Sequence, residues 1–502
     1  MNQVEELEQL REEKRRLCEA NENWQACVRE SLQAISDLQR QVKELEAVIS
    51  SQQERIKALE GQLAKDSHNS SLPPSSDRFR RPLKSLRQPS GKKPGGQKGH
   101  RGHHLRQVST PDEVLLHSVN CCEQCHADLS QTPAAIAERR QVVDLPVKRL
   151  WVKEYQVEEK QCPHCFHRTR AAFLPEVKAP AQYGLGIQAL ATYLVEGQSV
   201  PYARASQLLQ ALLGVQLSAG SIASFIKTCH QQLTGMEASL KAALLSVPVL
   251  HQDETGMRVN TEGWWVHVCS TDRLTYLAAH PSRGRPALDA LGIAPRFRGT
   301  SVHDGFNSYQ GYASTPALCN VHHLRELTFV EEELKQEWAH KMKDLLLEMK
   351  ASVEQAKASG SGELDRPLFS RLLRRYDEIL AEGYQATPPP GPRKKSAQGK
   401  RLPGKIKQTP ERNLLDRLSQ GKWAALRFLS DFAVPFDNNQ AERDLRMVKV
   451  QQKISGCFRT PVGLERFCRI RSYLSTLHKQ DLNLLAALEQ TFLGHPVLPA
   501  FT

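Results

Sequence analysis

The sequence has no long hydrophobic run and no apolar leader. Its longest apolar stretches, such as Ala242 to Leu250, fall well short of the roughly 20 residues that a transmembrane helix needs. The charged N-terminal region also lacks the apolar segment of a signal peptide. We therefore predict a cytoplasmic protein without a membrane partner.

Acidic residues are too few to balance the basic ones. The chain of 502 residues has 68 Lys and Arg against 55 Asp and Glu, which gives a net charge of +13 and a pI of about 9.2. With a membrane surface disfavoured, this excess predicts nucleic acid as the polyanionic partner. The length itself predicts about three domains.

One segment has no acidic residue at all. Residues 78–106 contain ten Lys or Arg, interleaved with glycine in KKPGGQKGHRGHH. An extended cationic arm of this kind can follow a phosphate backbone, because glycine allows close approach. A solvated basic linker is the equally simple alternative. The candidate nucleic-acid contacts in this arm are Lys92, Lys93, Lys98 and Arg101.

No glycine or proline occurs before Gly61, and residues 4–63 carry a heptad repeat. β-branched residues at a with leucine at d favour a parallel two-stranded coiled coil, and the polar residue Asn21 at an a position would fix its register. The alternative is a single amphipathic helix that packs on its own protein. We predict a homodimer through this coil. The a positions are Leu7, Lys14, Asn21, Val28, Ile35, Val42, Ile49, Ile56 and Leu63. The serines and prolines of NSSLPPSSD, residues 69–77, then predict a linker.

Because the sequence has no export signal, we expect its twelve cysteines to be reduced thiols rather than a disulfide scaffold. Two CxxC pairs stand out, because each can offer two thiolates to one ion. The alternating apolar residues between the pairs predict connecting strands: Val142, Leu145, Val147, Leu150 and Val152. We predict one structural Zn²⁺ in a zinc ribbon, with free thiols as the alternative. Its ligands would be Cys122, Cys125, Cys162 and Cys165.

Residues 182–245 predict helices, including a turn followed by a helix that is capped near Ser218 or Ser221. A helix-turn-helix reader of DNA is one interpretation, and an ordinary helical pair is the other. From Ser246 the pattern changes to three short strands, a helix over residues 285–293, a fourth strand ending at Asp304 and a fifth strand that passes into a helix.

Two aspartates follow apolar strand segments in this β-rich part. Asp253 lies beyond VPVL on the first strand, and Asp304 lies beyond the fourth. In a β-β-β-α-β arrangement these strands are neighbours, so the two carboxylates would meet at one edge of the sheet. Glu254 would point to the opposite face. Close carboxylates repel by about 4 kcal/mol per pair at an effective dielectric of 20, so they stay ionised only beside cations such as Mg²⁺.

A third acid, Glu442, opens a basic helix in FDNNQAERDLRMVKV, residues 436–450. On this fragment alone the simpler interpretation is a capping box, with Asn439 as N-cap and Glu442 bonding back to the free amide. With two aspartates elsewhere, Glu442 is instead the natural third ligand of two Mg²⁺ or Mn²⁺ ions for phosphodiester chemistry. Asn438 and Asn439 would cap the helix. Arg443, Arg446 and Lys449 would bind phosphate or form a solvated basic face.

The segments LHQDETGMRV, VHDGFNSY, ALCNVHHLREL, PFDNNQAERDLRMVKVQQKISG and RIRSYLSTLHKQ together resemble the bacterial transposases of insertion-sequence family 66. The resemblance implies an RNase H-like DDE transposase in which Asp253, Asp304 and Glu442 match the catalytic triad. It also implies a zinc-binding domain, small accessory proteins and a helical insertion after the second aspartate. The 138 positions from Asp304 to Glu442 leave room for that insertion, over about residues 334–429, with a basic loop at 388–405.

The predicted fold class is a multidomain α+β protein, associated with the bacterial nucleoid. Its parts are a coiled coil (1–65), a basic linker (66–110), a zinc ribbon (111–175), a helical, possibly DNA-binding region (176–245), a catalytic core in two pieces (246–333 and 431–502) and a helical insertion (334–430). The alternatives are a DNA-binding regulator with a silent RNase H-like fold, and a structure-selective nuclease. Cys319 and His322 resemble a CxxH pair of transposases with such insertions, although two ligands cannot complete a zinc site. A buried thiol beside a polar histidine is the favoured interpretation.

Overall fold

The computed structural model describes residues 3–65, 69, 107–133, 135–136, 138–141, 150–389 and 408–501. These residues form a mixed helix and sheet structure, in agreement with the predicted α+β class. The chain divides into two compact units. Unit 1 comprises Met1–Lys84 and Leu318–Asp437, and unit 2 comprises Ser85–Ala317 and Asn438–Thr502. Within the described ranges, no helix is long and apolar enough to cross a membrane.

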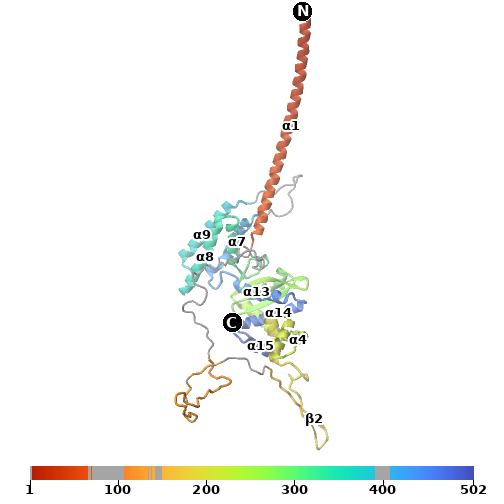
Figure 1. Ribbon diagram of the computed structural model, residues 1–502. Coiled ribbons are helices and arrows are strands. Elements are labelled where there is room, and N and C mark those ends of the chain that lie inside the picture. Colours follow the sequence, from red (N-terminus) through yellow and green to blue (C-terminus); the bar gives the residue numbers. More distant parts are fainter. Residues whose placement is uncertain are drawn as a thin grey trace. The chain divides into compact units, whose positions relative to one another are not determined.

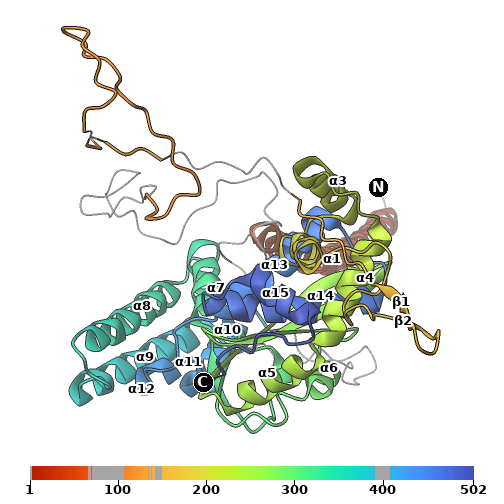
Figure 2. The ribbon, with the colours of Figure 1, turned by 90° about the horizontal axis from the view of Figure 1, so that it is seen from below.

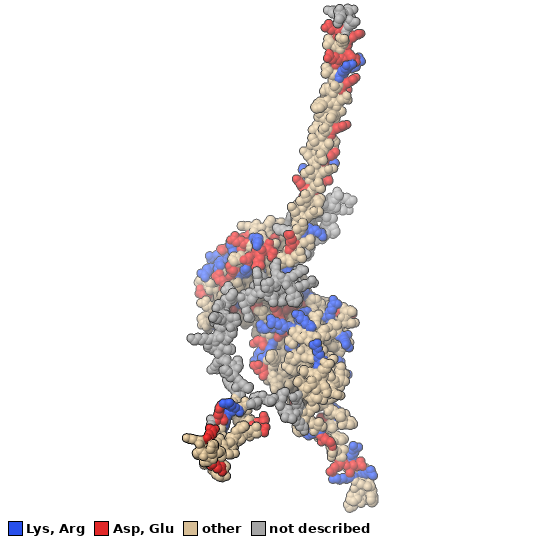
Figure 3. All heavy atoms as spheres, in the orientation of Figure 1, with Lys and Arg blue, Asp and Glu red and all other residues tan. Residues whose placement is uncertain are grey.

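Unit 1 is helical. The predicted N-terminal helix is confirmed as α1 (Gln3–Leu63), which carries acidic and basic side chains along its length (Figure 3). The remaining helices are α7 (Asn320–Glu332), α8 (Glu337–Ala358), α9 (Arg366–Ala386), α10 (Pro410–Gln420), α11 (Lys422–Ala425) and α12 (Arg427–Ser430). Helices α8 and α9 lie side by side (Figures 1 and 2).

The core of unit 1 follows from helical spacing. Leu372, Tyr376, Ile379 and Leu380 recur on one face of α9 and are buried. They join the buried face of α8 and the apolar residues of α10 in one hydrophobic cluster. The hydroxyl of Tyr376 donates to the carbonyl of Leu418, which satisfies the polar end of this buried ring.

Unit 2 begins with a short hairpin and a group of helices. Strands β1 (Glu159–Gln161) and β2 (Arg168–Arg170) pair antiparallel. The predicted helical region contains α2 (Leu185–Thr192), the π-helix η3 (Tyr193–Gly197), α3 (Tyr202–Leu213), α4 (Ala219–Gln232) and α5 (Thr234–Ser246). Ser218 is the N-cap of α4 and accepts from the amide of Ser221, as predicted. Gly214 ends α3 in the left-handed conformation, with φ of 74°.

The centre of unit 2 is a five-stranded sheet in the order β5-β4-β3-β6-β7. The strands are β3 (Val249–Val259), β4 (Glu262–Ser270), β5 (Thr275–His280), β6 (Thr300–His303) and β7 (Thr315–Leu318). The predicted meander is confirmed, because β3, β4 and β5 pair antiparallel. The predicted neighbours β3 and β6 pair parallel. Helix α6 (Arg285–Leu291) and the 3-10 turn η4 (Asn307–Tyr309) lie in the connections.

Helices cover both faces of this sheet. On one face, Met257, Val266, Val268 and Leu277 pack against α13 (Asn439–Ser455) and α14 (Pro461–Lys479). On the other face, Leu250, Cys269 and Tyr276 share a core with α5 and α6. Helix α15 (Leu484–Phe492) packs on α2 and α4. The helix that carries Glu442 therefore lies on the face to which odd-numbered residues of β3 point.

Candidate active site

Sheet register brings Asp253 and Asp304 together. His251 of β3 pairs with Val302 of β6, and both aspartates lie two residues further along these parallel strands. Neighbouring strands are about 4.8 Å apart, so the two residues are lateral neighbours. Strand β6 ends at His303, one residue before the predicted end at Asp304. Oδ1 of Asp304 accepts from the amide of Phe306 at 2.8 Å. This bond fixes the carboxylate in a local turn.

Asn438 holds the start of α13 against β3. Its Nδ2 donates to the carbonyl oxygen of Gln252 at 2.8 Å, and its Oδ1 lies 2.9 Å from Nδ1 of His251. The side chain of Asn438 is only 1% exposed. These bonds engage the two residues that precede Asp253, so the first turn of α13, with Glu442, is tied to the strand that carries Asp253.

The predicted capping box is wrong in its register. Helix α13 begins at Asn439, with Asn438 as the N-cap residue. Glu442 is then the fourth helical residue rather than the third, where a box places its acid. The side chain of Asn438 is used in bonds to β3 instead of a cap. Packing of Leu445 and Val448, worth about 1.5–3 kcal/mol each, holds the helix without the box.

The electrostatics of Asp253 reflect this crowding of carboxylates. Burial and the nearby charge of Glu254 raise its pKa to about 8, and the charges of Asp304 and Glu442 add to the rise. The amide of Glu254 opposes the shift by donating to Oδ1 of Asp253 at 2.8 Å. The two other predicted acids therefore both act on Asp253 within unit 2.

This donor set fits a hard divalent cation. Carboxylate oxygens are the ligands that Mg²⁺ and Mn²⁺ take, and a bound cation would keep Asp253 ionised near neutral pH. The three acids come from a strand, a strand end and a helix that are fixed by backbone pairing and core packing. Rigid elements of this kind hold ligands in place.

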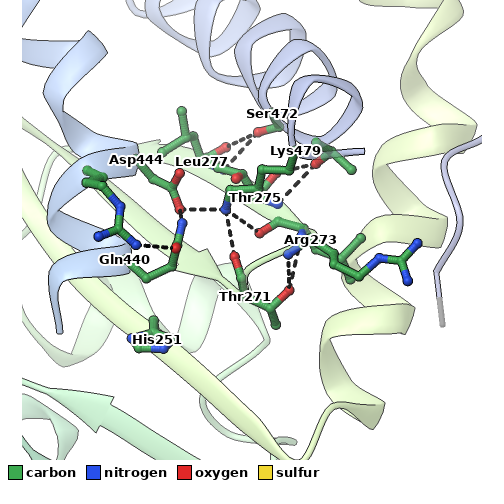
Figure 4. A network of polar contacts seen from close by, with 12 residues as sticks. His251, Thr271, Arg273, Thr275, Leu277, Gln440, Asp444, Ser472 and Lys479 are labelled. Atoms are coloured by element: carbon green, nitrogen blue, oxygen red, sulfur yellow. Dashed lines mark hydrogen bonds and ion pairs between the residues drawn. The ribbon is translucent and has the colours of Figure 1, made fainter. Parts of the chain in front are cut away.

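A buried ion pair anchors α13 two residues after Glu442. Lys479, at the end of α14, donates to Oδ2 of Asp444 at 2.8 Å and to the carbonyl oxygens of Thr271 and Leu274 (Figure 4). Gln440 also donates to Asp444. The ion pair thus connects α13, α14 and the β4–β5 turn. It was not predicted, because no local pattern in the sequence pairs two residues that are 35 positions apart.

The three basic residues predicted after Glu442 have different environments. Arg443 and Arg446 are exposed, and Arg443 donates to Oε1 of Gln440 at 2.6 Å. Lys449 is half-buried, and its ammonium donates to the carbonyl oxygen of Gly256 on β3 at 2.6 Å. Burial lowers the pKa of Lys449. Lys449 therefore connects the helix to the sheet, whereas the two arginines can reach a phosphate.

Each CxxC pair forms a local knuckle. The amides of Cys122 and Cys162 donate to the carbonyls of Ala127 and His167, and His126 and Phe166 donate back to the two cysteines. His126 and Phe166 have φ of 58° and 57°. The two knuckles thus have the same backbone form, and bonds within each pair lower the pKa of Cys122 and Cys162. Among described residues, the four thiols do not form one cluster, so the zinc site stays a prediction.

Several predicted features fall outside the described residues. They are Lys92, Lys93, Lys98 and Arg101 of the basic arm, most of the 388–405 loop, and Val142, Leu145 and Val147 of the proposed strands. Leu150 and Val152 are described but lie before β1 without forming a strand. Cys319 precedes α7 and is buried, and His322 lies in the first turn of that helix.

Glu254 has partners that sequence reasoning missed. Its side chain is 2% exposed and accepts from Nε of Arg283 and from the hydroxyl of Tyr309, both at 2.8 Å. As predicted, the pleat directs Glu254 to the face opposite Asp253. In the sequence, only the position of Glu254 next to Asp253 suggested a role for it, and that position could not identify Arg283 and Tyr309 as its hydrogen-bond donors.

Comparison with known proteins assigns the class of protein. A family model described as Transposase IS66 family matches residues 180–466, which is more than half of the chain. The protein is therefore a transposase, and it belongs to the IS66 family. A second family model, described only as a family of unknown function, matches residues 2–106. No curated protein matches the chain. Family membership implies DNA as the substrate and a dependence on divalent metal.

Proposed function

We propose that this transposase cuts the 3′ ends of an insertion element and joins them to target DNA, with Asp253, Asp304 and Glu442 as its catalytic carboxylates. The observation that carries the proposal is that Asp304, after β6, and Glu442, on α13, both raise the pKa of Asp253 on β3, where the register of β3 and β6 brings the two aspartates close. Two bound Mg²⁺ ions would supply an activated water or 3′-hydroxyl and stabilise the leaving oxygen.

The chain's own residues provide position and charge for this chemistry. The pairing of β3 and β6, which ends two residues before Asp253 and Asp304, brings the two aspartates close, and Asn438 ties the turn that carries Glu442 to β3. Exposed Arg443 and Arg446 extend from the same helix and can neutralise the phosphates of bound DNA. The sheet order and the return of α13 onto its face support an RNase H-like core, interrupted by a helical insertion.

The test incubates the purified protein with end-labelled DNA from the borders of its own element and Mg²⁺ or Mn²⁺. We expect nicking at the 3′ ends and joined products, with both lost in Asp253→Asn and Glu442→Gln. Glu465→Gln is the matched control, because Glu465 is an exposed glutamate on α14. Cleavage and joining that persist in Asp253→Asn and Glu442→Gln would show that the assigned site is wrong. Nicked DNA without joined products would identify a hydrolytic nuclease instead.

We also propose that α1 pairs two copies of the chain. The apolar heptad positions of α1 are exposed in the single chain, including Ile35 at 51% and Leu45 at 61%. Burial of this stripe against a second α1 would remove it from water. A dimer could bring two element ends together in one complex.

For the cysteines we propose one structural Zn²⁺ held by the two knuckles. Their matching backbone form and the lowered pKa of Cys122 and Cys162 favour thiolate ligands. Atomic emission should find one zinc per chain in the wild type, and less than half of that in Cys162→Ser. Equal zinc content in the two proteins would refute this site.

A further inference from the structure

Glu254 is a buried acid whose two oxygens are both occupied by donors. Nε of Arg283 donates to Oε1 and the hydroxyl of Tyr309 donates to Oε2, each at 2.8 Å. The side chain is 2% exposed, so a lost partner would leave a buried charge without compensation. Both oxygens of Glu254 are therefore held in place by donors from other segments.

The two donors come from segments beside the proposed catalytic carboxylates. Tyr309 lies in η4, five residues after Asp304, and its ring stacks on His303 at 4.6 Å between centroids. Arg283 lies in the β5–α6 connection, with its guanidinium carbon 4.2 Å from the ring centroid of Phe306 and 5.0 Å from that of Trp265. Such contacts between a cation and aromatic rings fix the arginine as well as pairing it.

These contacts form a continuous connection between the two aspartates. Phe306, which packs on Arg283, is also the residue whose amide binds Oδ1 of Asp304. Glu254, at the other end, follows Asp253 directly and its amide binds Oδ1 of Asp253. The backbone pairing of β3 and β6 ends at His251 and Val302, before either aspartate. Beyond that point, the Glu254 contacts connect the loop to the strand.

We propose that Glu254 is a positioning residue for the metal site, which sets the placement of Asp304 relative to Asp253 through Arg283 and Tyr309. The inference rests on the proposed function, since the metal site itself is part of that proposal. Groups that orient metal ligands typically contribute about 10–100-fold to metal affinity or activity. A residue that only stabilises the fold would not change metal affinity in the folded protein.

The test measures Mn²⁺ binding to the full chain by the loss of the free-ion signal in electron paramagnetic resonance. We expect Glu254→Ala to weaken tight Mn²⁺ binding about 10-fold or more. Glu237→Ala is the matched control, because Glu237 also pairs with an arginine and accepts from a tyrosine, Arg469 and Tyr276, but does not act on Asp253. Its Mn²⁺ affinity should stay within about twofold of wild type.

A milder pair of variants keeps the test decisive if Glu254→Ala does not fold. Tyr309→Phe removes one hydroxyl donor, and we expect Mn²⁺ affinity to fall by about tenfold, at the low end of effects on ligand-orienting groups. Tyr312→Phe is its control, because Tyr312 donates to Asp289 in the same way at 2.7 Å. Excess Mn²⁺ should restore DNA cleavage in Tyr309→Phe and leave Asp253→Asn inactive.

The outcomes separate the inference from the proposed function. If Asp253→Asn binds Mn²⁺ as tightly as wild type, the metal site itself is misassigned. If Asp253→Asn loses the tight binding while folded Glu254→Ala and Tyr309→Phe retain it, the metal site stands and the role of Glu254 is overturned. Weakened binding in both variants, with unchanged controls, supports the role of Glu254.

Discussion

Replacing Lys479 by methionine tests how the helix of Glu442 is held. The ammonium of Lys479 makes three bonds: to Asp444 at 2.8 Å, and to the carbonyl oxygens of Thr271 at 2.7 Å and Leu274 at 3.0 Å. The Lys479 side chain is 12% exposed and that of Asp444 is 8% exposed, so solvent screens the pair little. Methionine keeps most of the volume and removes all three bonds.

The expected loss is large, because the substitution leaves a buried carboxylate unpaired. Removing one partner of a buried ion pair costs about 3–5 kcal/mol. Since 1 kcal/mol shifts the melting temperature of domains of 150–250 residues by about 2–4 °C, we expect unit 2 to melt on the order of 10 °C lower. Combining Lys479→Met with Asp444→Leu removes the unpaired charge as well, so most of the lost stability should return.

Scanning calorimetry of the full chain measures these shifts, with the transition of unit 2 followed in each variant. Lys160→Met is the control, because Lys160 pairs with Glu158 at 2.7 Å in the same unit but both side chains are more than 70% exposed. This control should melt with the wild type. Two results would refute the reasoning. One is a melting temperature of Lys479→Met within about 2 °C of the wild type, and the other is a double variant that is no more stable than Lys479→Met.

Three further predictions concern pH, DNA and assembly. Burial lowers the pKa of His267 to about 4, below the unfolded value of about 6.5. The stability that depends on neutral His267, up to about 3 kcal/mol, is therefore present above pH 6.5 and is lost as the pH falls toward 4. His267→Gln should flatten the dependence of melting temperature on pH, and an unchanged slope would contradict this. In salt titrations of DNA binding, Arg446→Ala should lower the logarithmic slope by about one, whereas Lys449→Ala should leave it unchanged, because Lys449 binds Gly256 rather than phosphate. In sedimentation, Ile35→Asp with Val42→Asp should convert a dimer into a monomer, and a wild type that is already monomeric would exclude pairing through α1.

The strand pattern of unit 2 could be predicted because each strand is short, rich in β-branched or aromatic residues and bounded by turn residues. The positions of Asp253 and Asp304 at the ends of apolar strand segments followed from that pattern. The pairing of the two strands that carry or precede them also followed, since the order of elements makes β3 and β6 neighbours. The family of the chain was likewise predicted from motifs in the sequence and confirmed by the match over residues 180–466.

Local rules failed at the start of α13. Residues 439–442, Asn-Gln-Ala-Glu, fit a capping box with Asn439 as the N-cap. In the structure the N-cap residue is Asn438, one position earlier, and its side chain binds β3 rather than capping the helix. A side chain that can cap a helix can equally donate to a distant carbonyl, and only the packing of α13 on the sheet decides between them. Lys449 shows the same effect, since a basic residue on a basic helix proved to bind a strand carbonyl.

The sequence by itself determined the family and most helices and strands of unit 2, and it gave three acids as candidates for the site, because apolar periodicity and motif chemistry are local properties of the chain. Only the tertiary structure decided which groups surround those acids. The contacts of Asn438, the Lys479–Asp444 pair and the bonds of Glu254 to Arg283 and Tyr309 join residues from 29 to 187 positions apart. The energy of a buried charge depends on such partners, and no local pattern specifies them.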